Sequence, residues 1–203
     1  MKYFAQPTSK VDFDSIRYIE CLNSAYIKPK RMVYSENGKE KSWDIIASHD
    51  SVSILLYHRD FDSFVIVRQF RPAVYFQNGE GYTYELCAGL VDKPGKSLEE
   101  IASEEVLEEC GYEVLPSALK KIAVFYSSTG ISGSKQTIFF TTITEKNKRT
   151  QGGGIDEECI DVLFLPAQKA KDFIEDDSLA KTSGLCYAIR WYLDNFYDKE
   201  PAC

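Results

Sequence analysis

The sequence lacks the motifs of several common classes of site. Its six cysteines, at positions 21, 87, 110, 159, 186 and 203, have no CxxC spacing, so we expect neither bound zinc nor a disulfide framework. A chain with unpaired cysteines fits a reducing, cytoplasmic setting best. The two histidines, His49 and His58, have no partners at catalytic spacing, and both are interpreted as structural.

Long apolar runs and an excess of positive charge are also absent. No stretch approaches the length of a transmembrane helix, and the N-terminus lacks the apolar core of a signal peptide, so we expect no membrane association. The formal net charge of -7 at pH 7 argues against non-specific binding of nucleic acid. With 203 residues and 44% hydrophobic residues, the chain is predicted to form one ordinary domain with a small N-terminal appendage.

The pattern of apolar and turn residues predicts a mixed α/β (α+β) chain. Asn37-Gly38 is a strong hairpin signal, so residues 1–48 are expected to form a small antiparallel sheet, followed by the main domain at 49–203. Helices are expected from Ser97 to Gly111, at 167–175 and at 179–197. Further strands are expected at 52–58, 64–70, 82–87, 121–126, 136–142 and 160–165. Strands mixed with three helices predict a layered α/β/α domain.

The helix that begins at Ser97 carries a run of carboxylates. Ser97 and Glu100 form a capping-box pattern at its start. Glu105 and Glu109 are four residues apart, which puts both on one face of a helix with Glu108 beside them. These like charges repel one another, and a divalent cation such as Mg²⁺ would compensate them, because it prefers oxygen ligands. The alternative is an acidic helix face exposed to solvent.

The stretch from Glu104 to Tyr112 resembles the second half of the Nudix hydrolase signature, Arg-Glu-apolar-x-Glu-Glu-x-Gly-apolar. Residues 67–75 and 84–92 are similar to the branch that acts on ADP-ribose and nucleoside diphosphate sugars. Further segments resemble the uridine diphosphate glucose pyrophosphatase subfamily, namely residues 42–44, 49–52, 129–137 and 152–154. The resemblance covers roughly residues 40–195. It implies a Nudix α/β/α sandwich with a mixed sheet that hydrolyses UDP-glucose to UMP and glucose 1-phosphate, with ADP-ribose as the leading alternative substrate.

The resemblance also implies metal-binding and catalytic residues. In the family, Mg²⁺ or Mn²⁺ ions bridge the diphosphate while water attacks one phosphorus. Glu105 and Glu109 match the principal metal-binding glutamates, Glu108 an accessory ligand, and the backbone carbonyl of Ala88 a further ligand. A later acidic loop offers Glu158 as another ligand and either Asp156 or Glu157 as the general base. The alternative for this loop is a solvated acidic segment.

Four other residues are candidates for contact with the substrate. Arg68 and Arg71 resemble the phosphate-binding arginines of the branch. Because side chains alternate along a strand, only one should meet the substrate; Arg71 is favoured, and Arg68 is interpreted as a surface charge. Lys135 either contacts a phosphate or the sugar, or is an idle exposed lysine. Trp43 either stacks on the base or, by preference, packs in the core or at a dimer interface.

The resemblance implies a homodimer as well. Enzymes of this branch are generally homodimeric, so the N-terminal sheet is expected to pair with a second subunit, which would contribute to the nucleoside pocket.

Three features depart from the signature. Glu104 stands where the family has Arg, Lys96 stands where it has the first Glu, and the loop after Gly89 is one residue longer, with Pro94 as the expected insertion. A carboxylate at 104 cannot hold a catalytic glutamate by an ion pair. Either Lys96 or another lysine substitutes, or the metal affinity and rate differ. The intact ligand positions favour an active enzyme, and a catalytically silent nucleotide-sugar sensor is the alternative.

Overall fold

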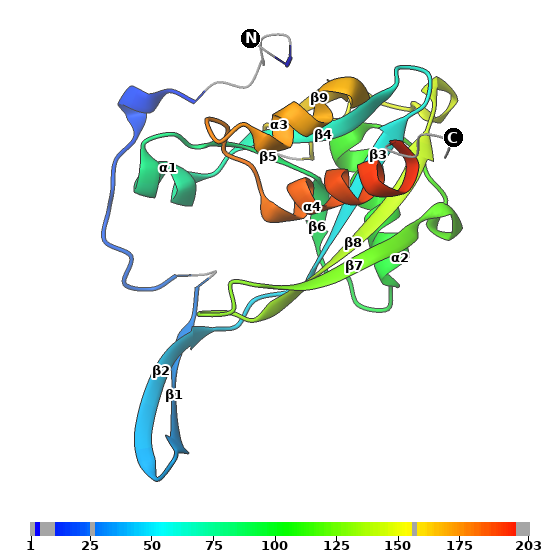
Figure 1. Ribbon diagram of the computed structural model, residues 1–203. Helices are drawn as coiled ribbons and strands as arrows, with labels where there is room; N and C mark the ends of the chain where they lie inside the picture. Colours follow the sequence, from blue (N-terminus) through cyan, green and yellow to red (C-terminus); the bar gives the residue numbers. More distant parts are fainter. Residues whose placement is uncertain (1–2, 5–10, 25–26, 156–157, 198–203) are drawn as a thin grey trace.

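The computed structural model describes residues 3–4, 11–24, 27–155 and 158–197, which are organised around one mixed sheet (Figure 1). Its main path runs β5-β4-β3-β8-β7, with β6 paired to β3 and β9 paired to β4. Strands β3 and β8 are parallel, and the other pairs are antiparallel. The strands are β1 (Pro29–Glu36), β2 (Lys39–Ile46), β3 (Ser51–His58), β4 (Ser63–Phe70), β5 (Tyr82–Glu85), β6 (Cys87–Leu90), β7 (Lys120–Ser127), β8 (Ser134–Ile143) and β9 (Asp161–Pro166).

Helices cover both faces of this sheet. Successive side chains of a strand point to opposite faces, and here apolar side chains on both faces are buried. Phe64 and Ile66 of β4 point into a core with α3 (Ala170–Glu175) and α4 (Ser183–Tyr192). Val65 and Val67 of the same strand point into a second core with α2 (Leu98–Glu105). The expected layered α/β/α fold with a mixed sheet is therefore confirmed.

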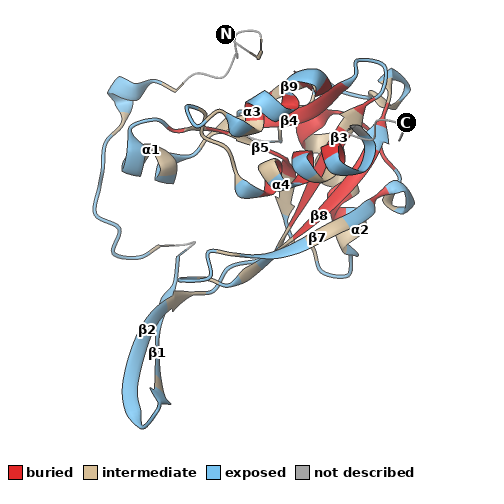
Figure 2. Cartoon of the chain, in the orientation of Figure 1, coloured by how far each residue is buried: buried red, intermediate tan, exposed pale blue. Residues whose placement is uncertain are grey.

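Strands β1 and β2 form the predicted hairpin, which projects from the body of the molecule (Figure 1). Asn37 and Gly38 make the turn with positive φ angles of 53° and 73°. Most of the hairpin is exposed (Figure 2). Trp43 is 53% exposed and donates its indole N–H to the carbonyl of Gly130 at 2.7 Å, so placement in the core is wrong. Residues 11–24 contain only a short 3₁₀ turn and add no strand to the N-terminal sheet.

Strands β3 and β4 separate along their length and so open the sheet. They pair only at Leu56–His58 and Ser63–Val65. Beyond that point β4 pairs with β5, and β3 pairs with β6. The strand predicted at 82–87 is therefore two strands, with Leu86 buried between them. Ala88 and Gly89, expected in a loop, lie within β6, and contacts between β6 and α2 bring them to the acidic helix.

Two helices differ from the sequence-based expectation. The acidic helix begins with the predicted capping box at Ser97 but continues after Glu105 as a π-helical turn, η2 (Val106–Cys110), which ends at Gly111. The last helix begins after an N-cap at Thr182 rather than at 179 and ends in a π-helical segment, η6 (Leu193–Tyr197).

Helix α1 (Pro72–Asn78) was not predicted, although Pro72 at its first turn and Gly79 after its end are typical helix boundaries. None of the helices in the described part of the chain is long and apolar enough to span a membrane.

Candidate active site

A cleft of about 510 Å³ opens where β3 and β4 separate. It is lined by residues from strands β3, β4, β5, β6 and β8, from α2 and η2, and from the loops before α1, α2 and β9. The structure brings into this cleft the predicted residues Arg71, Ala88, Glu105, Glu108, Glu109 and Glu158. It adds residues that the sequence did not single out, including Gln69, Glu85, Lys93 and Gln136.

Glu109 is the most buried carboxylate of the cleft, with 5% of its surface exposed. Its pKa is raised to about 7, mainly because burial disfavours the charged form. The backbone N–H of Ala88, which donates to Glu109 Oε2 at 2.9 Å, and the thiol of Cys87 oppose this rise, while Glu105 and Glu158 add to it. A cation bound beside Glu109 would stabilise its charged form.

Glu105 lies against the backbone of Gly89. A Cβ atom at position 89 would meet Glu105 Cδ at 2.1 Å and Oε1 at 2.3 Å, so only glycine leaves room for the carboxylate in this position. Burial raises the pKa of Glu105, Lys93 lowers it, and Glu108 raises it further. The strand-to-helix packing therefore fixes where the Glu105 carboxylate enters the cleft.

The glycine loop at 152–154 ties the acidic helix to the later acidic segment. The three glycines have φ angles of 72°, 107° and 89°, which side-chain-bearing residues rarely adopt. Two of their amides donate to the end of the helix, Gly153 to Glu109 O at 2.8 Å and Gly154 to Glu108 O at 3.2 Å. Glu158 follows, with its Oε2 accepting from the amide of Ile155 at 3.1 Å.

Two residues predicted in this segment, Asp156 and Glu157, lie outside the described residues.

Arg71 lies at the N-cap of α1 and lines the cleft. Its Nε and Nη2 atoms donate to the two carboxylate oxygens of Glu85 at 2.8 and 2.7 Å. This bidentate contact raises the pKa of Arg71 against the opposing effect of burial. Glu85 therefore fixes the guanidinium. In the sequence, Glu85 stands within residues 84–92, one of the segments that carry the family resemblance, but that segment did not indicate its pairing with Arg71.

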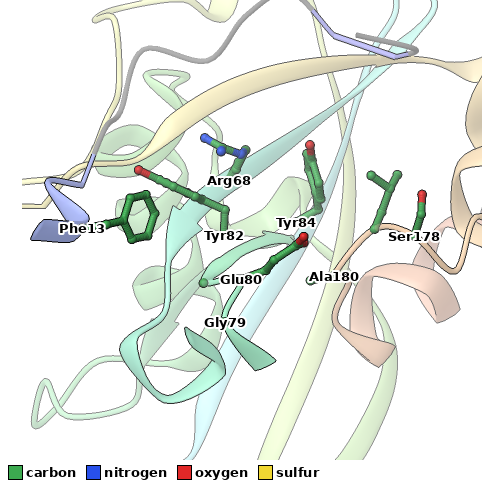
Figure 3. A pocket seen from close by; sticks show the side chains of 10 residues that line it. Phe13, Arg68, Gly79, Glu80, Tyr82, Tyr84, Ser178 and Ala180 are labelled. Atoms are coloured by element: carbon green, nitrogen blue, oxygen red, sulfur yellow. The ribbon is translucent and has the colours of Figure 1, made fainter. Parts of the chain in front are cut away.

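Arg68 lies in a different pocket of about 250 Å³, together with Tyr82 and Tyr84 (Figure 3). Its guanidinium carbon is 3.7 Å from the ring centre of Tyr82, and its Nη1 donates to the buried Asp161 at 2.9 Å. The side chain is only 14% exposed, so the interpretation as a surface charge is wrong. Strand alternation does place Arg68 and Arg71 in separate pockets.

The other two substrate-binding candidates do not line the cleft of the described chain. Lys135 is exposed, with its backbone amide bonded to Asp50 Oδ1 at 2.8 Å, and its neighbour Gln136 lines the cleft instead. Trp43 lies on the projecting hairpin.

Lysines gather around Glu104, the residue that departs from the signature. Lys96 forms a close ion pair with Glu104, and Lys93 Nζ lies 3.1 Å from Glu104 Oε2. The Lys96 and Lys93 hydrogen bonds lower the pKa of Glu104. A lysine at 96 and a glutamate at 104, in place of the signature's glutamate and arginine, thus form an ion pair with each other. Lys93 also lines the cleft.

The residues of the cleft suit a divalent cation. Glu105, Glu108, Glu109 and Glu158 supply oxygen donors, and the ammonium of Lys93 already acts as a stand-in cation beside Glu105 and Glu108. Within the described residues, however, no three His, Cys, Asp or Glu side chains are arranged as a preformed metal-binding group.

The raised pKa of Glu109 predicts how the metal-free protein responds to pH. Between the ordinary value of 4.5 and about 7, the folded state holds a proton that the unfolded chain has lost. Stability should therefore fall as pH rises through this range, by at most about 3 kcal/mol from this group. Urea unfolding with a chelator present should show this fall in the wild type relative to Glu109→Gln, which cannot titrate. Parallel stability curves would contradict the prediction.

No family model matches the chain, but several known proteins are similar to it, and those named below are all pyrophosphatases. It is 40% identical over 200 residues to uridine diphosphate glucose pyrophosphatase NUDT14 of Bos taurus, covering 85% of this chain and 90% of that protein. The Mus musculus protein of the same name is 38% identical with the same coverage. GDP-mannose pyrophosphatase of Enterobacter sp. (strain 638) is 32% identical over 154 residues, covering 75% of this chain and 72% of that protein.

Proposed function

The chain belongs to the Nudix hydrolase family, and we propose on this basis that it hydrolyses the diphosphate of a nucleoside diphosphate sugar. UDP-glucose is the proposed substrate, cleaved to UMP and glucose 1-phosphate, in line with the names of the relatives at 40% and 38% identity. The observation that carries the proposal is the cleft itself. The four carboxylates proposed as ligands and the fixed arginine Arg71 line the same cleft, which suits a diphosphate bound with a cation.

The residues of the cleft have separable roles in this reaction. Arg71, oriented by Glu85, would bind the diphosphate oxygens and orient the scissile bond. Glu105, Glu108, Glu109 and Glu158 would hold Mg²⁺, or alternatively Mn²⁺. When bound, this cation neutralises phosphoryl oxygens and lowers the pKa of a bound water. Water adds to one phosphorus, the bridging P–O bond breaks, and Asp156 or Glu157 is proposed to accept the proton of the water.

A substrate panel tests this proposal. UDP-glucose, ADP-ribose and GDP-mannose should be incubated with the metal-free protein and with added Mg²⁺ or Mn²⁺, and the nucleoside monophosphate measured. We expect UMP from UDP-glucose only when a divalent cation is present. Release of AMP from ADP-ribose alone would favour the alternative substrate. Calorimetric binding of UDP-glucose in Ca²⁺ without turnover in Mg²⁺ would favour a silent sensor.

We also propose a homodimer formed through the β1–β2 hairpin. A two-stranded hairpin is only marginally stable by itself, and this one exposes Met32, Val33 and Trp43 by 49%, 58% and 53%. A second copy of the chain would cover these side chains and contribute to the nucleoside side of the cleft. A cytoplasmic location is proposed as well, supported by the buried free thiols of Cys87 and Cys110.

The dimer proposal predicts the effect of removing exposed apolar side chains. Met32→Ser combined with Trp43→Ser should weaken the dimer about tenfold or more, because both side chains would lose an apolar partner surface. Sedimentation equilibrium measures the dissociation constant. Leu115→Ser, which alters a 68% exposed leucine elsewhere, is the control and should leave the constant unchanged. A monomeric wild type would contradict the proposal.

A further inference from the structure

Lys93 holds a position that the motif does not explain. It lies in the loop between β6 and α2, and its ammonium is 3.1 Å from Glu104 Oε2, 3.5 Å from Glu105 Oε1 and 3.8 Å from Glu108 Oε1. The side chain is 32% exposed, so it is neither buried in the core nor free in solvent. One cation thus contacts two carboxylates proposed to bind the divalent ion and one carboxylate outside that set.

Glu104 is the contact that lies outside the proposed ligand set. It does not line the cleft, and it pairs with both Lys93 and Lys96. An arginine at position 104, as in the signature, would repel Lys93 at this distance. The exchange of charges between positions 96 and 104 therefore creates a carboxylate that can hold Lys93 at the edge of the cleft.

A lysine ammonium and a divalent cation cannot share Glu105 and Glu108 without strong repulsion, because both are positive and would lie within a few ångströms of each other. The alternative partner is already in contact, since Glu104 is closer to Lys93 than either ligand carboxylate is. A rotation of the flexible lysine side chain is enough to exchange these contacts.

We propose that Lys93 is a positioning residue that neutralises Glu105 and Glu108 in the metal-free protein, is displaced by the divalent cation, and is then retained by Glu104. The inference rests on the proposed metal-dependent function. Lys93 keeps the carboxylates together before the cation arrives and lowers the affinity for that cation. Once displaced, it stays at the rim of the cleft as a positive charge for an anionic substrate.

Metal binding to the substrate-free protein tests this inference. Mn²⁺ is titrated into metal-free protein, and the free ion is measured by electron paramagnetic resonance. Lys93→Gln should bind Mn²⁺ about tenfold more tightly than the wild type, because a competing charge has been removed. In melting experiments, Lys93→Gln should lower Tm without metal, and saturating Mn²⁺ should close the gap to the wild type.

Lys96→Gln is the matched control. It removes the same charge from the same loop, but within the described residues Lys96 has no ion pair with Glu105 or Glu108. Its affinity for Mn²⁺ should change less than about threefold. An unchanged or weaker affinity in Lys93→Gln, an equal gain in Lys96→Gln, or a wild type that binds no Mn²⁺ would overturn the inference.

The result is distinguishable from a failure of the proposed function. If no nucleotide sugar is hydrolysed but the affinities for Mn²⁺ change as expected, the role of Lys93 stands and the proposed reaction is wrong. If UDP-glucose is hydrolysed but the affinities of the two variants do not differ, the reaction stands and the role of Lys93 is wrong.

Discussion

Glu109→Gln is expected to reduce kcat for UDP-glucose hydrolysis at least about 10³-fold. The substitution removes the charge of the most buried carboxylate in the cleft while keeping its size. Glutamine can still accept the hydrogen bond from the Ala88 amide, so the local structure should persist. The loss would therefore come from weaker stabilisation of the cation and of the reacting phosphate. Steady-state kinetics with saturating Mg²⁺ measures it.

Glu99→Gln provides the control for this prediction. It removes a carboxylate from the same helix, but Glu99 does not line the cleft. Its kcat should stay within about twofold of the wild type, as for a typical surface substitution. A Glu109→Gln variant with near-wild-type kcat would show that the cleft carboxylates are not the catalytic centre, whatever the family.

Gly89→Ala is expected to reduce kcat about 10²-fold while changing the unfolding midpoint little. The new methyl group would occupy the space of the Glu105 carboxyl group, 2.1 Å from its carbon. The end of a glutamate side chain can rotate away at small cost to the fold, but the carboxylate then leaves its place in the cleft. A displacement of about 1 Å at a catalytic group is enough for a loss of this size.

The measurement pairs kinetics with thermal unfolding. Gly130→Ala is the matched control, because a Cβ at Gly130 would have no heavy atom within 4 Å. It should leave both kcat and the unfolding midpoint near the wild-type values. If Gly89→Ala retained full activity, Glu105 would not need its observed position, and its proposed role as a metal ligand would be wrong.

The features that sequence predicted correctly are those set by near neighbours. The turn at Asn37-Gly38 and the capping box at Ser97 each depend on a few adjacent residues, and both formed as expected. The alternation of side chains along a strand likewise predicted that Arg68 and Arg71 point to different sides, and they line different pockets. The resemblance then identified a set of glutamates that the fold brings to one cleft.

The features that sequence missed depend on distant segments. The division of residues 82–87 into two strands arises because β3 and β4 separate, which no local pattern reveals. The pairing of Arg68 with Asp161 joins strands 93 residues apart in sequence. Lys93 was not recognised because its proposed role depends on its contact with Glu104, which lies 11 residues later on the helix.

The glycine loop at 152–154 has a consequence for how tolerant this chain is of mutation. Its amides bond to the backbone carbonyls of Glu108 and Glu109, the same residues whose side chains enter the cleft. The backbone of each of these two glutamates is therefore held by the glycine loop, while its side chain lines the cleft. A survey of all single substitutions should find the three glycines nearly as intolerant as the glutamates, although glycine has no side chain to offer a substrate.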